Sequence, residues 1–146
     1  MKLAIPFLAI LSVASGCASK YGPPTTGPTA SARLVAPSAL VNKNGEKGSC
    51  TEYEVVVTKY YSEEFLLPAG KEIWVGHSFI ADTVTTTGNC RVAYVFTPEA
   101  GARYVMRAGG RRICSASIQR VTPSGDTVDE PTFRPSRWPS LCQLPG

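Results

Sequence analysis

The chain has 146 residues and a formal net charge of +4, and 43 % of its residues are hydrophobic. This length allows one domain rather than two. The positive charge is small and scattered, which argues against nucleic acid as a partner.

The N-terminus has the pattern of an export signal. Lys2 precedes the apolar run 3–13, which is about half the roughly 20 residues needed to span a bilayer. Pro6 would interrupt a membrane helix. A short apolar run followed by small residues is typical of a cleavable signal rather than a membrane anchor.

The end of this signal resembles a lipobox, in which small residues precede an invariant cysteine that is diacylated before cleavage. The matching residues are Ala14-Ser15-Gly16-Cys17, with alanine where the first box position is more often leucine. The resemblance implies a lipoprotein signal peptide over 1–16 and lipidation of Cys17. The alternative is ordinary cleavage near Ala14 or Gly16, which would release a soluble protein.

The residue after the cysteine bears on the destination. In enterobacterial lipoproteins an aspartate there favours retention in the inner membrane, and this chain has Ala18. The resemblance therefore implies an outer-membrane lipoprotein, held by its lipid anchor, with the domain facing the periplasm or the exterior.

Residues 17–38 are predicted to be the lipidated cysteine and a flexible tether. The stretch 21–32 is rich in proline, glycine, threonine and serine and has almost no large apolar side chains. Such a segment buries too little surface to offset the entropy lost on ordering. We therefore expect the folded domain to occupy residues 39–146.

From Ala39 onward, apolar runs separated by turn residues predict strands. The expected strands are 50–58, 72–80, 90–96, 103–108 and 112–121, and residues 60–67 fit either one helical turn or a strand. In the first strand, Tyr53, Val55 and Val57 form an apolar face opposite two glutamates. No amphipathic helix is evident, so the sequence predicts an all-β fold, a single small antiparallel β-sandwich.

Five cysteines in an exported chain leave one without a disulfide partner, which acylation of Cys17 would explain. The remaining four are Cys50, Cys90, Cys114 and Cys142. Two disulfides suit an oxidising compartment. None of the spacings is the short C-x-x-C of metal sites and there is one histidine, so no metal or cofactor is expected.

Four cysteines allow three connectivities, and the sequence does not decide among them. Cys90 and Cys114 occupy inward positions of their strands, so the simplest pairing is Cys90–Cys114 in the core and Cys50–Cys142 at the tail. In a simple meander a third strand would separate Cys90 from Cys114 by roughly 9.5 Å. A disulfide tolerates a Cα separation of about 7 Å, so this pairing requires the chain to change sheet.

Two groups of side chains are candidate binding residues. One flanks a predicted hairpin tip and suits a phosphate or an acidic partner, and the other lies in the proline-rich tail 131–146 and has side chains frequent at interface hot spots. They are Arg107, Arg111 and Arg112 at the hairpin, and Arg134, Arg137 and Trp138 in the tail. The alternatives are a solubilising turn and, as the favoured interpretation of the tail, a packed segment fastened by a disulfide.

His77 shares its strand face with Ile73, Val75 and Phe79, a position typical of a hydrogen-bonded core or edge residue rather than a catalyst. The chain has no H-E-x-x-H, no G-x-S-x-G and no phosphate-binding glycine loop. We therefore expect no enzymatic activity.

Turn residues carry a resemblance over roughly residues 68–118. The segments are P-A-G-K at 68–71, Cys90, F-T-P-E-A-G-A-R-Y at 96–104, and Cys114. They resemble a group of small, functionally uncharacterised proteobacterial lipoproteins, and the 96–104 segment is similar to hairpins of transthyretin-like sandwiches. The resemblance implies a fold and no activity.

These features favour an envelope lipoprotein whose domain binds another envelope protein or a cell-wall component without catalysis. The alternative is a lipoprotein inhibitor or immunity-type protein that blocks an envelope hydrolase through an arginine-bearing loop. An enzyme with an unfamiliar site around His77 is the least favoured hypothesis.

Overall fold

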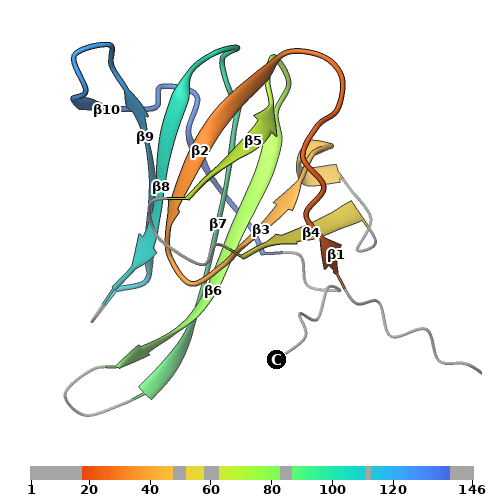
Figure 1. The fold of residues 1–146 in the computed structure, drawn as a ribbon. Helices are drawn as coiled ribbons and strands as arrows, with labels where there is room; N and C mark the ends of the chain where they lie inside the picture. Colours follow the sequence, from red (N-terminus) through yellow and green to blue (C-terminus); the bar gives the residue numbers. More distant parts are fainter. Residues whose placement is uncertain (1–17, 48–51, 58–62, 83–86, 111–112, 139–146) are drawn as a thin grey trace, which may run out of the picture.

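The computed structural model describes residues 18–47, 52–57, 63–82, 87–110 and 113–138, and these form two β-sheets. The six-stranded sheet has the order β1 (Ser19–Lys20), β4 (Tyr53–Val56), β3 (Ala39–Asn42), β6 (Ile73–Asp82), β7 (Thr87–Phe96) and β11 (Arg134–Ser136). The five-stranded sheet has the order β10 (Thr127–Asp129), β9 (Ser115–Val121), β8 (Arg103–Gly109), β2 (Thr29–Val35) and β5 (Glu64–Pro68). A 3₁₀ turn, η1 (Gly45–Lys47), follows β3 (Figure 1).

The predicted all-β class is confirmed, and most predicted strands are present. The strands expected over 72–80, 90–96, 103–108 and 112–121 correspond to β6, β7, β8 and β9. β6 and β7 form a long antiparallel pair that runs from Ile73 opposite Phe96 to Asp82 opposite Thr87. The far end of this pair extends beyond the rest of the fold (Figure 1). The two sheets pack through a shared apolar core, an arrangement consistent with a β-sandwich.

The predicted tether is wrong for the described residues 18–38, and so is a domain boundary at residue 39. β1 pairs with β4, and β2 lies inside the five-stranded sheet between β8 and β5. The side chains of Ala30, Ala32 and Leu34 are buried. The sequence Thr-Ala-Ser-Ala-Arg-Leu-Val alternates in the manner of a strand, with small apolar residues on the inner side. The composition of the segment obscured this strand pattern, because the inner positions are mostly alanines and a search for large apolar side chains overlooks them.

The expectation of a purely antiparallel sandwich is corrected as well. β2 pairs with β8 in parallel, and β1 pairs with β4 in parallel. A parallel pair needs a long crossover connection. The chain between β2 and β8 supplies it by building most of the six-stranded sheet.

Apolar residues fill two clusters, one on each face of the six-stranded sheet. The main core lies between the sheets and includes Leu34, Ile73, Tyr94 and Phe96. The second cluster lies on the outer face and consists of Leu40, Tyr53, Trp74 and Val95, with Ala18, Val55, Ala93 and Trp138 packed against it. Two covered faces explain why β6 begins with apolar residues on both of its sides, Ile73, Trp74 and Val75.

The second cluster also corrects the predicted face of β4. Tyr53 and Val55 belong to the outer cluster, whereas Val56 faces the main core. Val57 lies after the strand and is 71 % exposed. The alternation is real, but it marks the outer side of the sheet.

The predicted disulfide between Cys90 and Cys114 is present, with a Cα separation of 5.5 Å. Its predicted place in the core is only half right, because Cys90 is buried but Cys114 is exposed and precedes β9. The chain leaves the six-stranded sheet at Phe96 and enters the other sheet at Arg103, so this bond joins the two sheets. The segment 96–104, which resembles a hairpin in sequence, is therefore a connection between sheets. Cys17, Cys50 and Cys142 lie outside the described residues, so the structure places one of the two predicted disulfides.

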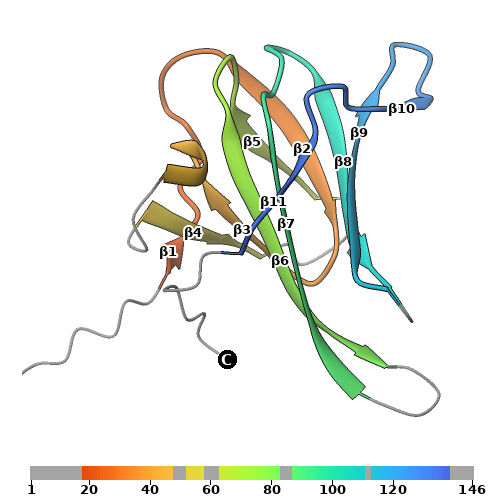
Figure 2. The same ribbon diagram turned by 180° about the vertical axis from the view of Figure 1, so that it is seen from behind.

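The described part of the tail packs against the domain, as its favoured interpretation predicted. β11 pairs with β7 at the edge of the six-stranded sheet, and Figure 2, the view from behind, shows the two strands side by side. Pro135 lies within this short strand, a position that an edge strand tolerates.

Candidate functional site

One side of the two-sheet arrangement is open. There β5 ends the five-stranded sheet, and β4 with the two-residue β1 ends the six-stranded sheet. The space between them is a groove of about 590 Å³. Its walls, which we call the inter-sheet groove, consist of Lys20, Tyr21, Pro23, Ser31, Val55, Val56, Val57, Glu63, Glu64, Phe65 and Leu66.

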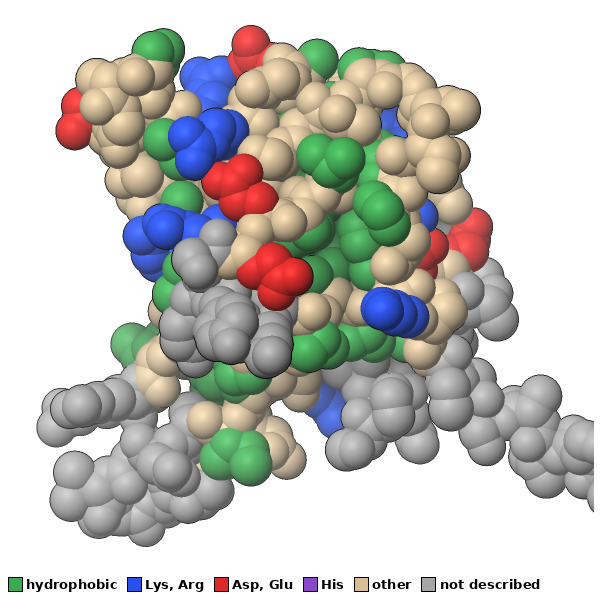
Figure 3. Space-filling model, in the orientation of Figure 1, with side chains coloured by type: hydrophobic (Ala, Val, Ile, Leu, Met, Phe, Trp, Pro, Cys, Tyr) green, Lys and Arg blue, Asp and Glu red, His purple; other side chains and the backbone are tan. Residues whose placement is uncertain are grey.

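The inter-sheet groove has apolar walls and a partly exposed rim. Val57 is 71 % exposed and Leu66 is 43 % exposed, while Tyr21 and Phe65 are half-buried. Figure 3 shows apolar side chains gathered on this face of the molecule, with acidic and basic side chains at the border. Contiguous apolar surface with a polar rim is typical of an interaction site.

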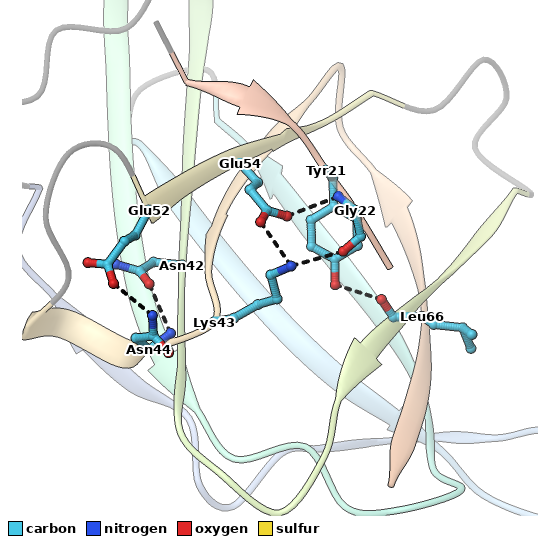
Figure 4. A network of polar contacts seen from close by, with 8 residues as sticks. All are labelled: Tyr21, Gly22, Asn42, Lys43, Asn44, Glu52, Glu54 and Leu66. Atoms are coloured by element: carbon cyan, nitrogen blue, oxygen red, sulfur yellow. Dashed lines mark hydrogen bonds and ion pairs between the residues drawn. The ribbon is translucent and has the colours of Figure 1, made fainter. Parts of the chain in front are cut away.

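Tyr21 connects the two sheets across this open side. Its backbone N–H donates to the carbonyl of Val55 at 2.9 Å, and its hydroxyl donates to the carbonyl of Leu66 at 2.7 Å (Figure 4). Its ring packs edge-on against Phe65, with 5.7 Å between centroids. Burial, with a smaller contribution from the carboxylate of Glu54, raises the pKa of Tyr21, so the hydroxyl stays a hydrogen-bond donor.

An ion pair beside Tyr21 fixes the chain as it leaves β1. The ammonium group of Lys43 lies 2.9 Å from Glu54 and also donates to the carbonyl of Gly22 at 2.9 Å. Glu54 accepts a hydrogen bond from the N–H of Gly22 at 3.0 Å. Figure 4 shows these contacts converging between β3, β4 and the segment after β1. Lys43 is thereby held 5.2 Å from the centroid of the Tyr21 ring, which adds a cation–π contact.

A second pair of contacts shapes the end of β3. The side-chain oxygen of Asn42 accepts a hydrogen bond from the N–H of Asn44 at 2.9 Å. The side chain of Asn44 donates to Glu52 at 2.9 Å (Figure 4). An asparagine that caps its own turn in this way fixes the direction of the following segment, which brings Lys43 toward Glu54.

The charged rim of the inter-sheet groove differs between its two sides. Lys20 lies on the β1 side, and Glu63 and Glu64 lie on the β5 side. Arg103 approaches Glu64 to 2.9 Å. The hydrogen bond from Arg103 lowers the pKa of the Glu64 carboxyl. This pair is largely exposed, so it contributes little to stability.

Of the tail residues named as binding candidates, Trp138 packs against the domain, whereas Arg134 and Arg137 are exposed. Trp138 contacts Trp74 edge-on at 5.7 Å, and Arg91 lies 5.9 Å from the centroid of its ring. The indole N–H of Trp74 donates to Ser136 at 3.1 Å. Within the described residues, the indole N–H of Trp138 is buried without a hydrogen-bond partner.

The two predicted arginine groups are not brought together. Arg107 lies on β8 and donates to Gln119 at 2.8 Å, whereas Arg134 lies on β11 of the other sheet and pairs with Glu72. Arg137 is exposed beside a shallow hollow of about 640 Å³ that Glu46 and Trp138 also line. Arg111 and Arg112 lie outside the described residues.

His77 is a buried, hydrogen-bonded core residue, as its strand position predicted. Its exposed fraction is 1 %. Nδ1 lies 3.2 Å from the carbonyl of Ser38, which cannot donate, so Nδ1 carries the proton and Nε2 accepts from the Tyr94 hydroxyl at 3.2 Å. Burial lowers the pKa of His77 to about 4. The imidazole is therefore neutral near pH 7 and holds β6, β7 and the loop before β3 together.

The residues that line the inter-sheet groove were missed by sequence reasoning. Tyr21 stands alone in a proline- and glycine-rich stretch, and Phe65 and Leu66 lie in a segment of ambiguous structure. The available signal was the alternation in residues 29–35, which places the preceding chain against a sheet. The groove is formed by two sheet edges that are far apart in sequence, and no local sequence pattern predicts that these edges lie next to each other.

No family model, curated protein or solved structure matches the chain. Among the described residues, no helix is long and apolar enough to cross a membrane. Within that same part of the chain, no cluster of three or more histidine, cysteine, aspartate or glutamate side chains could hold a metal ion.

Proposed function

We propose that the protein is a cell-envelope lipoprotein, anchored through an acylated Cys17, whose all-β domain is a non-enzymatic binding module. The observation that carries the proposal is the contiguity of the lipobox-like Ala14-Ser15-Gly16-Cys17 with the folded domain. Ala18 packs against the outer apolar cluster, and Ser19 begins β1. A lipid on Cys17 would hold this domain directly at the membrane.

The disulfide between Cys90 and Cys114 supports an exported location. Disulfides persist in oxidising compartments such as the periplasm and are rare in the cytosol. This bond joins two sheets across 24 residues of chain, so it is part of the fold's architecture. An outer-membrane location with the domain in the periplasm or at the exterior remains part of the proposal.

The inter-sheet groove is the surface that best supports a binding role. Its walls are apolar, and several polar groups near it are engaged structurally: Tyr21 with Leu66, Lys43 with Glu54, and Arg103 with Glu64. A catalytic site needs a nucleophile or base positioned toward a cavity. The buried imidazole of His77 is instead hydrogen-bonded within the fold.

Metabolic labelling with a palmitate analogue, followed by membrane fractionation, tests the anchor. In the natural host, the wild-type protein should incorporate label and fractionate with membranes. Cys17→Ser should lose the label and become soluble, and Ser15→Ala should retain both properties because small residues fit that lipobox position. Label or full membrane association in Cys17→Ser would refute the anchoring proposal.

A further inference from the structure

We propose that the side of the domain that holds the inter-sheet groove lies on the bilayer surface, with the exposed rim around Val57 inserted among the lipid headgroups. This inference rests on the proposed acylation of Cys17. It extends that proposal by fixing the orientation of the domain and by naming the partner of the groove as a lipid surface.

The anchor is close to the fold in sequence. Two residues of chain lead from the proposed acylation site to Ser19 in β1, and two residues span at most about 7 Å. Ser19 pairs with Glu54 on β4, and Val57 follows three residues further along. With a strand rise of about 3.3 Å per residue, Val57 lies within roughly 20 Å of the acylated residue. A domain held so closely cannot keep this edge far from the membrane.

The β5 edge of the groove offers few backbone partners to a peptide. In the described residues, β5 pairs with β2 on one side, and on its other side the carbonyl of Leu66 already accepts the Tyr21 hydroxyl. Pro68, at the end of β5, has no N–H to donate. An added peptide strand would need backbone partners at this edge. Lipid needs none, so the groove favours an apolar phase over a peptide.

Charged side chains are unevenly distributed around the groove. Lys20 lines the groove on the side of the anchor, where anionic headgroups would attract it. The carboxylates of Glu63 and Glu64 lie on the opposite rim. Charge therefore brings the Lys20 side of the groove closer to the headgroups than the side that carries Glu63 and Glu64.

Hydrogen exchange on the lipidated protein tests this orientation. The purified protein is reconstituted in vesicles of phosphatidylethanolamine and phosphatidylglycerol and compared with the mature Cys17→Ser chain in solution. We expect at least threefold slower exchange at the amides of Val57 and Leu66 in the vesicles. The amides of residues 119–122 and 124–127, at the opposite edge of the five-stranded sheet, should exchange equally in both samples.

Val57→Asp and Ile113→Asp form a matched pair, because each replaces an exposed apolar side chain with a carboxylate. The side chain of Val57 is 71 % exposed and that of Ile113 is 80 % exposed. Both variants should keep the wild-type unfolding temperature. In lipidated protein on vesicles, Val57→Asp should remove the protection and Ile113→Asp should retain it. In the soluble Cys17→Ser background, Val57→Asp should lower vesicle binding about tenfold, since burial of one apolar side chain is lost.

The outcomes separate this inference from the proposed function. Intact-mass measurement first establishes whether Cys17 carries acyl chains; without them, the anchoring proposal itself fails. Acylated protein whose groove amides exchange at the soluble rate overturns the orientation alone. Protection of the same amides by an envelope protein in the absence of vesicles would also overturn it, in favour of a protein-binding groove.

Discussion

The two sides of this fold are closed by different means. On one side, the Cys90–Cys114 bond joins β7 to the chain just before β9 and locks the sheets covalently. On the other side, the described residues show Tyr21 as a bridge, with one hydrogen bond to Leu66 and a ring contact to Phe65. The covalent side is also covered by the chain after β10, whose Phe133 packs against Tyr94, whereas the tyrosine side leaves an apolar groove between the sheet edges.

This difference suggests that one side of the fold supplies stability and the other side is available for interaction. A disulfide stabilises chiefly by restricting the unfolded chain, and it does so wherever it lies in the fold. A single side-chain hydrogen bond contributes about 1 kcal/mol. The fold can therefore depend on its covalent side for stability and leave apolar surface exposed on the other side.

Removal of the disulfide should produce the largest loss. For a loop of 24 residues, the chain-entropy model gives about 3.5 kcal/mol of unfolding free energy. We expect the double variant Cys90→Ala, Cys114→Ala to show a loss of that order in urea unfolding, with Ser115→Ala as a control of small effect. A loss below about 1 kcal/mol would show that packing alone closes this side.

The disulfide side is also where the sequence was most predictive. Cys90 and Cys114 share the alternation of nearby apolar residues, which suggested their pairing, and the distance limit on a disulfide required a change of sheet. The structure has that change between Phe96 and Arg103. Local periodicity and covalent geometry together were sufficient for this pairing. The alternation did not show that Cys114 is exposed and precedes β9.

The groove side could not be predicted in the same way. β2 presents alanines to the core, so the usual signal of large apolar residues is weak. β1 is two residues long, and its pairing with β4 joins segments more than thirty residues apart. Tyr21 gains its role when β4 and β5 approach each other, which is a property of the tertiary structure.

The middle of the six-stranded sheet should respond to pH. The folded pKa of His77 is about 4, below its usual value of 6.5, so unfolding takes up a proton. Its contribution is complete above pH 6.5 and is lost as the pH falls toward 4. We expect a loss of about 2 kcal/mol between pH 7.5 and pH 5 from this group.

Urea unfolding of wild type and His77→Gln at several pH values measures this contribution. The variant keeps a neutral hydrogen-bonding side chain, so its stability should change less over the same interval. The disulfide-free variant should retain the wild-type pH dependence, because His77 contacts Ser38 and Tyr94 rather than the cysteines. Equal slopes for wild type and His77→Gln would exclude burial of a neutral imidazole as the cause.

The smallest expected effect is at the tyrosine bridge. Tyr21→Phe keeps the ring contact with Phe65 and removes the hydrogen bond to Leu66, so we expect a loss of about 1 kcal/mol in urea unfolding. If the two sides are independent, this loss should be the same in the disulfide-free background, within about 0.5 kcal/mol. Coupling beyond that limit would mean that closure of one side depends on the other. Independence would allow the tyrosine side to open onto a partner while the covalent side stays closed.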